Sequence, residues 1–212
     1  SVVNNLIMLK SLFTFPYYHS TIRDYNKDDI INIALDNYEQ QPSRNTWNEG
    51  CDLHHSNTDE CSQQQLDLAS VYSHYIQHTK QLLSHLGAPD YKFDLDIANY
   101  TVTTGIQSMM GHHHYPALFT GIHYIKYEPK HHKPTTFNNP SHLESVLKPY
   151  TDQASFFPNT FLSNWMYPQV ELPDIQEDSI IITPGYLSHY LPPSHSDEPR
   201  ITIVFNVNPL DE

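Results

Sequence analysis

The sequence predicts an α+β fold that is mainly β, in which helices support a sheet or a sandwich. Helical periodicity is confined to the first 92 residues, whereas an alternation of period two dominates from Phe93 onward. The composition agrees with this division. Sixteen prolines and 15 tyrosines against 6 glycines indicate short strands joined by proline-bounded loops, and not a bundle of helices.

Two segments in the N-terminal part have the apolar spacing of amphipathic helices. The first runs from Lys27 to Glu39, behind polar capping residues. The second is predicted from Ser62, as the N-cap, to Gly87, because glycine commonly follows the last turn of a helix. Its expected apolar face consists of Leu66, Ala69, Tyr72, Ile76, Leu83 and Leu86. We expect both helices to pack on the outside of a sheet.

The polar stretch from Gln40 to Gln65 lacks periodicity and is predicted to be a surface loop. It contains the two cysteines of the chain, Cys51 and Cys61, together with His54 and His55. Free surface thiols in a reducing compartment are the plain interpretation. A disulfide or a Cys2His2 zinc site is the alternative, although the spacing lacks a second knuckle.

Strand-like alternation begins at Phe93 and recurs almost to the C-terminus. The predicted strands are 93–103, 118–127, 161–172, 179–183 and 201–207, and the stretch 6–13 is expected to be a further strand. Asp94 and Asp96 alternate with apolar residues, so we expect them on an outward face. The segment from Glu128 to Asn159 has five prolines and no period. It is therefore predicted to be an insertion that acts as a lid over a functional site.

Acidic residues dominate the charge of this chain of 212 residues and 24.6 kDa. Asp and Glu number 24 against 11 Lys and Arg, which gives a net charge of −13. Such a surface repels phosphate backbones, so nucleic acid is not an expected partner. No window approaches the roughly 18 consecutive apolar residues of a membrane span, and the N-terminal apolar stretch lacks a basic leader. We expect a single cytoplasmic domain, residues 1–212, without a membrane partner.

A set of histidines has the spacing of a metal site built on strands. His112 and His114 are two residues apart, so on a strand their side chains share one face while His113 points away. His189 follows 75 residues after His114, behind a predicted strand and a Pro-Gly turn. Two imidazoles from one strand and a third from a distant strand can form a facial set on iron. Because the chain has 15 histidines, a triplet without a common metal is the alternative.

Two separated segments contain longer motifs. Residues 111–126 read Gly-His-His-His-Tyr-Pro-Ala-Leu-Phe-Thr-Gly-Ile-His-Tyr-Ile-Lys, and residues 178–206 end in Arg-Ile-Thr-Ile-Val-Phe-Asn. The first is similar to the pattern His-x-His-Pro-x-Ser-x-Leu-Ser-Gly-Val-Tyr-Tyr-Leu-Lys. The second is similar to Gly-Asp-Leu-x-x-Phe-Pro-Ser-x-Leu-x-His followed by Glu-Arg-Ile-Ser-Ile-x-Phe-Asn. In order and spacing they resemble a family of 2-oxoglutarate/Fe(II) oxygenases from bacteria and phages, of the prolyl-hydroxylase-like superfamily, over about half the chain.

This resemblance implies that His112, His114 and His189 hold Fe(II). The second of these positions departs from the wider superfamily, which usually has Asp or Glu where this chain has His114. An imidazole in place of a carboxylate makes the site more positive by one charge and removes an anionic hydrogen-bond acceptor.

The resemblance also implies how 2-oxoglutarate is held. Arg200 falls on the residue that pairs with the distal carboxylate of this co-substrate, and a guanidinium fork suits that task. Tyr100 and Tyr124 fall on strands that flank the ligand strand, where related enzymes donate a phenol hydroxyl to the co-substrate. The alternative for both is that they are core residues. Ascorbate is a further candidate cofactor beside Fe(II) and 2-oxoglutarate.

The implied fold is a double-stranded β-helix, a jelly roll of about eight strands. Residues 1–92 would give helical support and an N-terminal strand, and residues 93–208 the catalytic barrel with the insertion 128–159. The implied reaction is 2-oxoglutarate-dependent hydroxylation of a small molecule or a peptide. If the chain is encoded by a phage, its compartment would be the host cytoplasm.

Two other functions stay open at this point. A three-histidine dioxygenase of the cupin type would bind its substrate directly and need no oxoglutarate, and Arg200 argues against it because that design requires no carboxylate anchor. A catalytically silent jelly-roll module for binding or structure is the other alternative. The primary substrate and the oligomeric state are not encoded in any motif.

Overall fold

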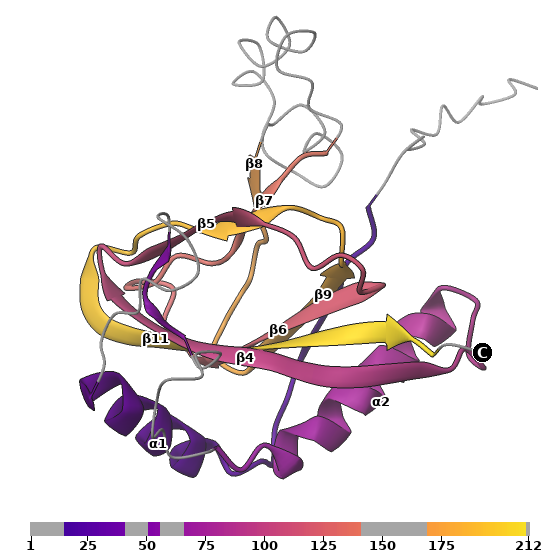
Figure 1. The fold of residues 1–212 in the computed structure, drawn as a ribbon, viewed down its shortest axis with the longest axis horizontal. Helices are drawn as coiled ribbons and strands as arrows, with labels where there is room; N and C mark the ends of the chain where they lie inside the picture. The colour runs from indigo at the N-terminus through magenta and orange to yellow at the C-terminus, as the bar shows by residue number, and fades with distance from the viewer. Residues whose placement is uncertain (1–14, 41–50, 56–65, 141–168, 211–212) are drawn as a thin grey trace, which may run out of the picture.

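The computed structural model describes residues 15–40, 51–55, 66–140 and 169–210. Two antiparallel sheets face each other, and two helices cover the outer face of the larger sheet (Figure 1). The major sheet has the order β1 (Tyr18–Thr21), β9 (Ser179–Pro184), β6 (Phe119–Lys126), β11 (Ser196–Pro209), β4 (Phe93–Gly105) and β3 (His54–His55). The minor sheet has the order β2 (Cys51–Asp52), β5 (Ser108–His112), β10 (His189–Leu191), β7 (Thr136–Asn138) and β8 (Gln169–Glu171).

The two helices are α1 (Lys27–Gln40) and α2 (Ala69–His85). The prediction for α1 is confirmed, and Gly87 follows the last turn of α2 with φ of +80°. The predicted N-cap at Ser62 is wrong, because residues 66–68 are described and are not helical. Hydrogen bonds of Asp67 accompany the later start of α2, at Ala69. Its carboxylate accepts a hydrogen bond from the Ala69 backbone N–H (3.1 Å), and its carbonyl accepts one from the Asn26 amide (3.1 Å).

The predicted apolar face of α2 is confirmed in part, because Leu83 is buried and Leu66, Tyr72 and Ile76 pack against the core. Val71, Tyr75 and Leu82 are buried against the major sheet, whereas Leu86 is exposed. The ring of Tyr75 stacks on Phe205 of β11 at a centroid distance of 4.4 Å. Phe205 in turn covers Gly121 of β6, where an added Cβ would collide with the ring. This aromatic stack therefore sets how closely the helix approaches the sheet.

Most predicted strands are present. Residues 93–103, 118–127, 179–183 and 201–207 correspond to β4, β6, β9 and β11. The predicted strand 161–172 is described only at its end, where β8 occupies Gln169–Glu171, and the predicted strand 6–13 lies outside the described residues. Three strands within the first 92 residues, β1, β2 and β3, join the two sheets. The N-terminal part is thus more than a helical support.

The predicted surface loop between residues 40 and 65 is wrong for residues 51–55. There β2 pairs with β5 in the minor sheet and β3 pairs with β4 in the major sheet, so the chain crosses between the sheets at the fully buried Leu53. A crossing of five residues is too short to show any period, so the pattern of apolar residues does not reveal it. His54 contacts Tyr100 on the helix side, while His55 lines the space between the sheets. A zinc site that uses both histidines is therefore contradicted.

The predicted insertion 128–159 is wrong in its first part. Thr136 and Phe137 of β7 are buried, and Phe137 pairs in register with His189 of β10. Residues 136–138 are therefore a strand of the minor sheet beside a predicted site residue. Residues 141–159 lie outside the described part, and so does the prediction of a lid there. Among the described helices, neither is long and apolar enough to cross a membrane.

Candidate metal centre and pocket

Three histidines converge between the two sheets, as their spacing predicts. His112 ends β5, His189 begins β10, and the two residues are register partners. Ring centroids of His112 and His189 are 4.6 Å apart, and those of His114 and His189 are 5.3 Å apart. One ligand nitrogen from each of the three lies within 4.8 Å of the others, so the set could hold a single metal ion. His113 is exposed, as predicted.

Hydrogen bonds fix the tautomers of two of these histidines. The Nδ1 atom of His112 lies 3.0 Å from the carbonyl oxygen of Met110, and that of His189 lies 3.0 Å from the carbonyl oxygen of Leu187. A carbonyl oxygen only accepts, so each imidazole donates its proton from Nδ1. Nε2 is then the unprotonated nitrogen in both rings, which is the form that binds a metal.

His114 is held differently, because β5 ends at His112. Its backbone N–H donates to the carbonyl oxygen of Gly185 (2.8 Å), in the turn between β9 and β10. Any side chain at residue 185 would collide with the carbonyl oxygen of Ala117, so this close approach requires glycine. The Nδ1 atom of His114 lies 3.0 Å from Oδ1 of Asn206 on β11. Its Nε2 atom is buried and has no hydrogen-bond partner among the described residues.

Asn206 sets the tautomer of His114, and it was missed from the sequence. Its Nδ2 atom faces Oδ2 of Asp96 at 3.4 Å, and its Oδ1 atom also accepts from the hydroxyl of Thr120 at 3.4 Å. Because a carboxylate can only accept, Asp96 orients the amide so that its oxygen faces His114. Asp96 is exposed, as predicted. It also contributes, through Asn206, to leaving Nε2 of His114 unprotonated.

Burial keeps these imidazoles neutral. Loss of solvation lowers the pKa of His189 to about 3, and the neighbouring His112 lowers it further. The same causes lower the pKa of His114 to about 4. Burial likewise lowers the pKa of His112. All three therefore offer a lone pair at neutral pH without first having to lose a proton.

Arg200 lies in the same pocket and is 2% exposed. Its guanidinium donates to the hydroxyls of Thr202 (3.5 Å) and Thr135 (3.4 Å) and lies 5.1 Å from the ring centroid of Tyr124. The Nε atom has no hydrogen-bond partner, and no Asp or Glu of the described residues forms an ion pair with this guanidinium. A buried cation without a counter-charge is costly unless an anion binds to it. The arrangement suits a carboxylate ligand.

The two tyrosines proposed from the resemblance lie in different places. Tyr124 is fully buried beside Arg200, and its hydroxyl accepts from the backbone N–H of Thr135 (3.2 Å). Tyr100 is not brought to the pocket. Its hydroxyl accepts from the side-chain amide of Asn37 on α1 at 2.8 Å. Side chains alternate along β4, so Asn99 and Thr101 face the pocket while Tyr100 faces the helices.

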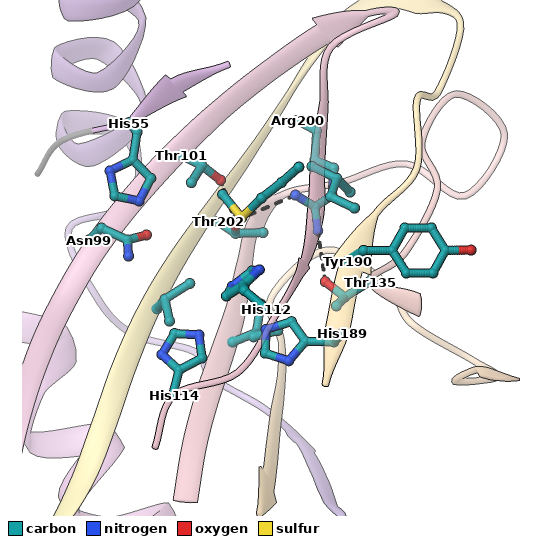
Figure 2. Close-up of a pocket in the computed structure, with 14 residues that line it drawn as sticks. His55, Asn99, Thr101, His112, His114, Thr135, His189, Tyr190, Arg200 and Thr202 are labelled. Carbon is teal, nitrogen blue, oxygen red and sulfur yellow. Dashed lines mark hydrogen bonds between the residues drawn. The ribbon is translucent and has the colours of Figure 1, made fainter. Parts of the chain in front are cut away.

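The pocket has about 430 Å³ of space between atoms, part of it open to solvent. Figure 2 shows the three histidines below Arg200 and Thr202, with Asn99 and His55 on the wall formed by β4 and β3. Asn99 was missed from the sequence, and His55 was considered only as a zinc ligand in the predicted loop. The apolar lining consists of Met109, Ile122, Leu191 and Val204.

Solved structures similar to this one confirm the predicted jelly roll. A prolyl-4-hydroxylase from Pseudomonas putida is 8% identical, with a TM-score of 0.52 and coverage of 93% of this chain and 95% of that one. The carbocyclase SnoK of nogalamycin biosynthesis is 13% identical, with a TM-score of 0.60 and coverage of 93% and 81%. The viral collagen prolyl hydroxylase of Paramecium Bursaria Chlorella virus-1 is 11% identical, with a TM-score of 0.52 and coverage of 92% and 96%.

The sequence comparison goes beyond the fold. None of the curated proteins matches the sequence. The model of one protein family, described as "Putative 2OG-Fe(II) oxygenase", matches residues 100–206, which is half of the chain. The matched range contains the three converging histidines and Arg200. The chain belongs to this family of 2-oxoglutarate- and Fe(II)-dependent oxygenases.

Proposed function

We propose that this enzyme is a hydroxylase that uses Fe(II) and 2-oxoglutarate, with a small molecule or a peptide as its primary substrate. The observation that carries the proposal is a buried Arg200 without an acidic partner, in one pocket with three converging neutral histidines. When bound, Fe(II) and 2-oxoglutarate convert a substrate C–H bond and dioxygen to an alcohol, with succinate and carbon dioxide as co-products. Two of the similar structures are prolyl hydroxylases, which supports hydroxylation as the outcome.

The proposed ligands to Fe(II) are His112, His114 and His189, each through Nε2. The donor set fits the metal because iron accepts imidazole readily and His114 Nε2 is a buried nitrogen without a partner among the described residues. Three neutral ligands leave the full positive charge on the ion. 2-Oxoglutarate carries two carboxylates, so this co-substrate would be attracted both to the ion and to Arg200.

Arg200 is the proposed anchor for the distal carboxylate of 2-oxoglutarate. Thr135 and Thr202 each accept one hydrogen bond from the guanidinium, and the ring of Tyr124 lies beside it. These contacts restrict the rotation of the fork before a carboxylate arrives, which lowers the entropy cost of binding. A three-histidine dioxygenase without oxoglutarate would have no use for such a preorganised cation.

The test is a titration of 2-oxoglutarate into protein loaded anaerobically with Fe(II), followed by a succinate assay with ascorbate as the reductant. We expect one iron per chain and succinate formation that depends on oxygen. Arg200→Lys should retain iron but bind 2-oxoglutarate more weakly by about 1.5–3 kcal/mol, because the charge remains and the fork is lost. Arg23→Lys, at an exposed position, is the matched control.

Equal 2-oxoglutarate affinities for the wild type and Arg200→Lys would contradict the anchor. Oxygen consumption that does not require 2-oxoglutarate would instead favour the three-histidine dioxygenase. Iron binding without any turnover would favour a silent jelly-roll module.

A further inference from the structure

The pocket wall formed by β4 and β3 has polar groups that the proposed metal and co-substrate sites do not use. Asn99 and Thr101 line the pocket from β4, and His55 lines it from β3, where it is the register partner of Thr101. Figure 2 shows Asn99 and His55 on one side of the three histidines, and Arg200 with Thr135 on the other. Asn99 and Arg200 come from the adjacent strands β4 and β11 of the major sheet, so both face the same pocket.

The register of the major sheet places Asn99 near the histidines. Along the pocket face of β11, Asn206 contacts His114, Val204 comes next, and Arg200 lies four residues beyond Val204. Asn99 is the register partner of Val204. It is thus one step along the sheet from the residue that holds His114, whereas the proposed carboxylate anchor is further along the strand. A group bound at Asn99 would lie beside the metal.

The amide oxygen of Asn99 lacks a partner. The residue is 7% exposed, and its Oδ1 atom is buried with no hydrogen-bond donor among the described residues. Leaving a buried amide oxygen unpaired destabilises a fold, and buried polar groups are nearly always paired. A buried acceptor that faces a pocket therefore indicates a ligand that brings a donor.

We propose that Asn99 binds the primary substrate by accepting a hydrogen bond from a neutral N–H or O–H group on a compact apolar skeleton. This inference rests on the proposed function. In the amide orientation that the structure shows, the buried unpaired group is the oxygen, which pairs with a donor and not with a carboxylate of 2-oxoglutarate. None of the described residues that line the pocket is Asp or Glu, so an ammonium donor would have no counter-charge. Apolar contacts for the skeleton come from Met109, Ile122, Leu191 and Val204.

The experiment measures binding of two probes of the same shape to the zinc-loaded protein with 2-oxoglutarate. 2-Pyrrolidone carries an N–H donor, and cyclopentanone has a CH2 group in its place. Ligand-observed NMR titrations should show that the wild type binds 2-pyrrolidone about tenfold more tightly, as expected for one hydrogen bond to a buried acceptor. In Asn99→Leu the two probes should bind equally.

Asn208→Leu is the matched control, because it makes the same substitution on the same face of the sheet outside the pocket. It should keep the preference of the wild type. Equal binding of both probes to the wild type, or no binding of either, would overturn the proposal; equal binding would mean that water satisfies Asn99. A preference for 2-pyrrolidone that survives in Asn99→Leu would also overturn it.

Two further measurements distinguish a substrate subsite at Asn99 from a structural role of the same side chain. The metal-free Asn99→Leu protein should melt at the same temperature as the wild type or higher, because an unpaired polar atom has been removed. A large drop would show that Asn99 serves the fold and would overturn the proposal. Zinc content and 2-oxoglutarate affinity are determined on the same samples. A protein that binds neither zinc nor 2-oxoglutarate would contradict the proposed function. A donor preference that is lost only in Asn99→Leu would still support the subsite.

Discussion

Buried histidines lie on both faces of the major sheet, and the two groups have much in common. On the pocket side, burial lowers the pKa of His189 to about 3. On the helix side, burial and the charge of Lys27 lower the pKa of His123 to about 3 as well. The Nε2 atom of His123, like that of His114, is buried without a partner among the described residues. Burial, a depressed pKa and an unpaired nitrogen therefore do not by themselves distinguish a metal site from a core residue.

The convergence of three histidines distinguishes the pocket side from the helix side. His123 donates to or accepts from the hydroxyl of Tyr75 at 3.0 Å, and its ring neighbours are the tyrosines of the helix side. Only on the pocket side does the described part of the chain bring three potential ligand nitrogens together. A metal gains its binding energy from several ligands at once, whereas a single core histidine gains only packing and one hydrogen bond.

The largest expected effect is on metal binding. His112→Ala and His189→Ala should each abolish binding of one divalent ion per chain, because two remaining ligands cannot complete the facial set. The matched change on the other face is the double variant Tyr75→Phe/His123→Phe, which should bind metal like the wild type. Metal content after dialysis, measured by elemental analysis, checks both. Undiminished metal in the two alanine variants would contradict the site.

The sequence predicted best the residues that lie on strands with a clear alternation. The spacing of His112, His114 and His189 and the position of Arg200 are carried by strands whose alternation is legible, so their convergence could be predicted. Tyr100 was predicted wrongly to reach the pocket. Side chains alternate along β4, so its neighbours Asn99 and Thr101 face the pocket and Tyr100 faces the helices. Applying the same parity from Arg200 along β11 leads directly to Asn206, which the prediction overlooked.

Other features could not be predicted from the chain in this way. His55 reaches the pocket from a two-residue strand that follows a crossing between the sheets, and no periodicity exists over so few residues. Strand β7 of the minor sheet lies in a proline-rich segment of irregular composition. Both strands are stabilised by partners far away in the sequence, and such tertiary pairing overrides local propensity.

A smaller effect is expected from the group that orients His114. Asn206→Ala removes the acceptor for Nδ1–H, so the ring can place its proton on Nε2 and withdraw that nitrogen from the metal. Loss of such a supporting contact typically weakens metal affinity by about ten- to a hundredfold. Competition with a chelator measures the change. Asn208→Ala on the same strand is the control, and an Asn206→Ala protein with the affinity of that control would show that Asn206 has no part in the site.

The last expected effect concerns stability, and it tests whether His123 belongs to the core alone. Its folded pKa of about 3 lies below the value of about 6.5 in an unfolded chain, so between these values only the unfolded state takes up the proton. Stability of the metal-free protein should therefore fall as the pH drops below about 6.5. At pH 5 the contribution of one such group is a loss of about 2 kcal/mol.

Urea unfolding at pH 7 and pH 5 in the presence of a chelator measures this loss. His114 and His189 also have lowered pKa values and add to it in the wild type. The Tyr75→Phe/His123→Phe variant should lose about 2 kcal/mol less than the wild type between the two pH values, because one titrating group is gone while the others remain. Replacing both members of the pair avoids leaving a buried hydroxyl unpaired. Tyr75→Phe alone retains His123 and should keep the full dependence; the same dependence in the double variant would mean that His123 is already protonated in the folded protein at pH 5.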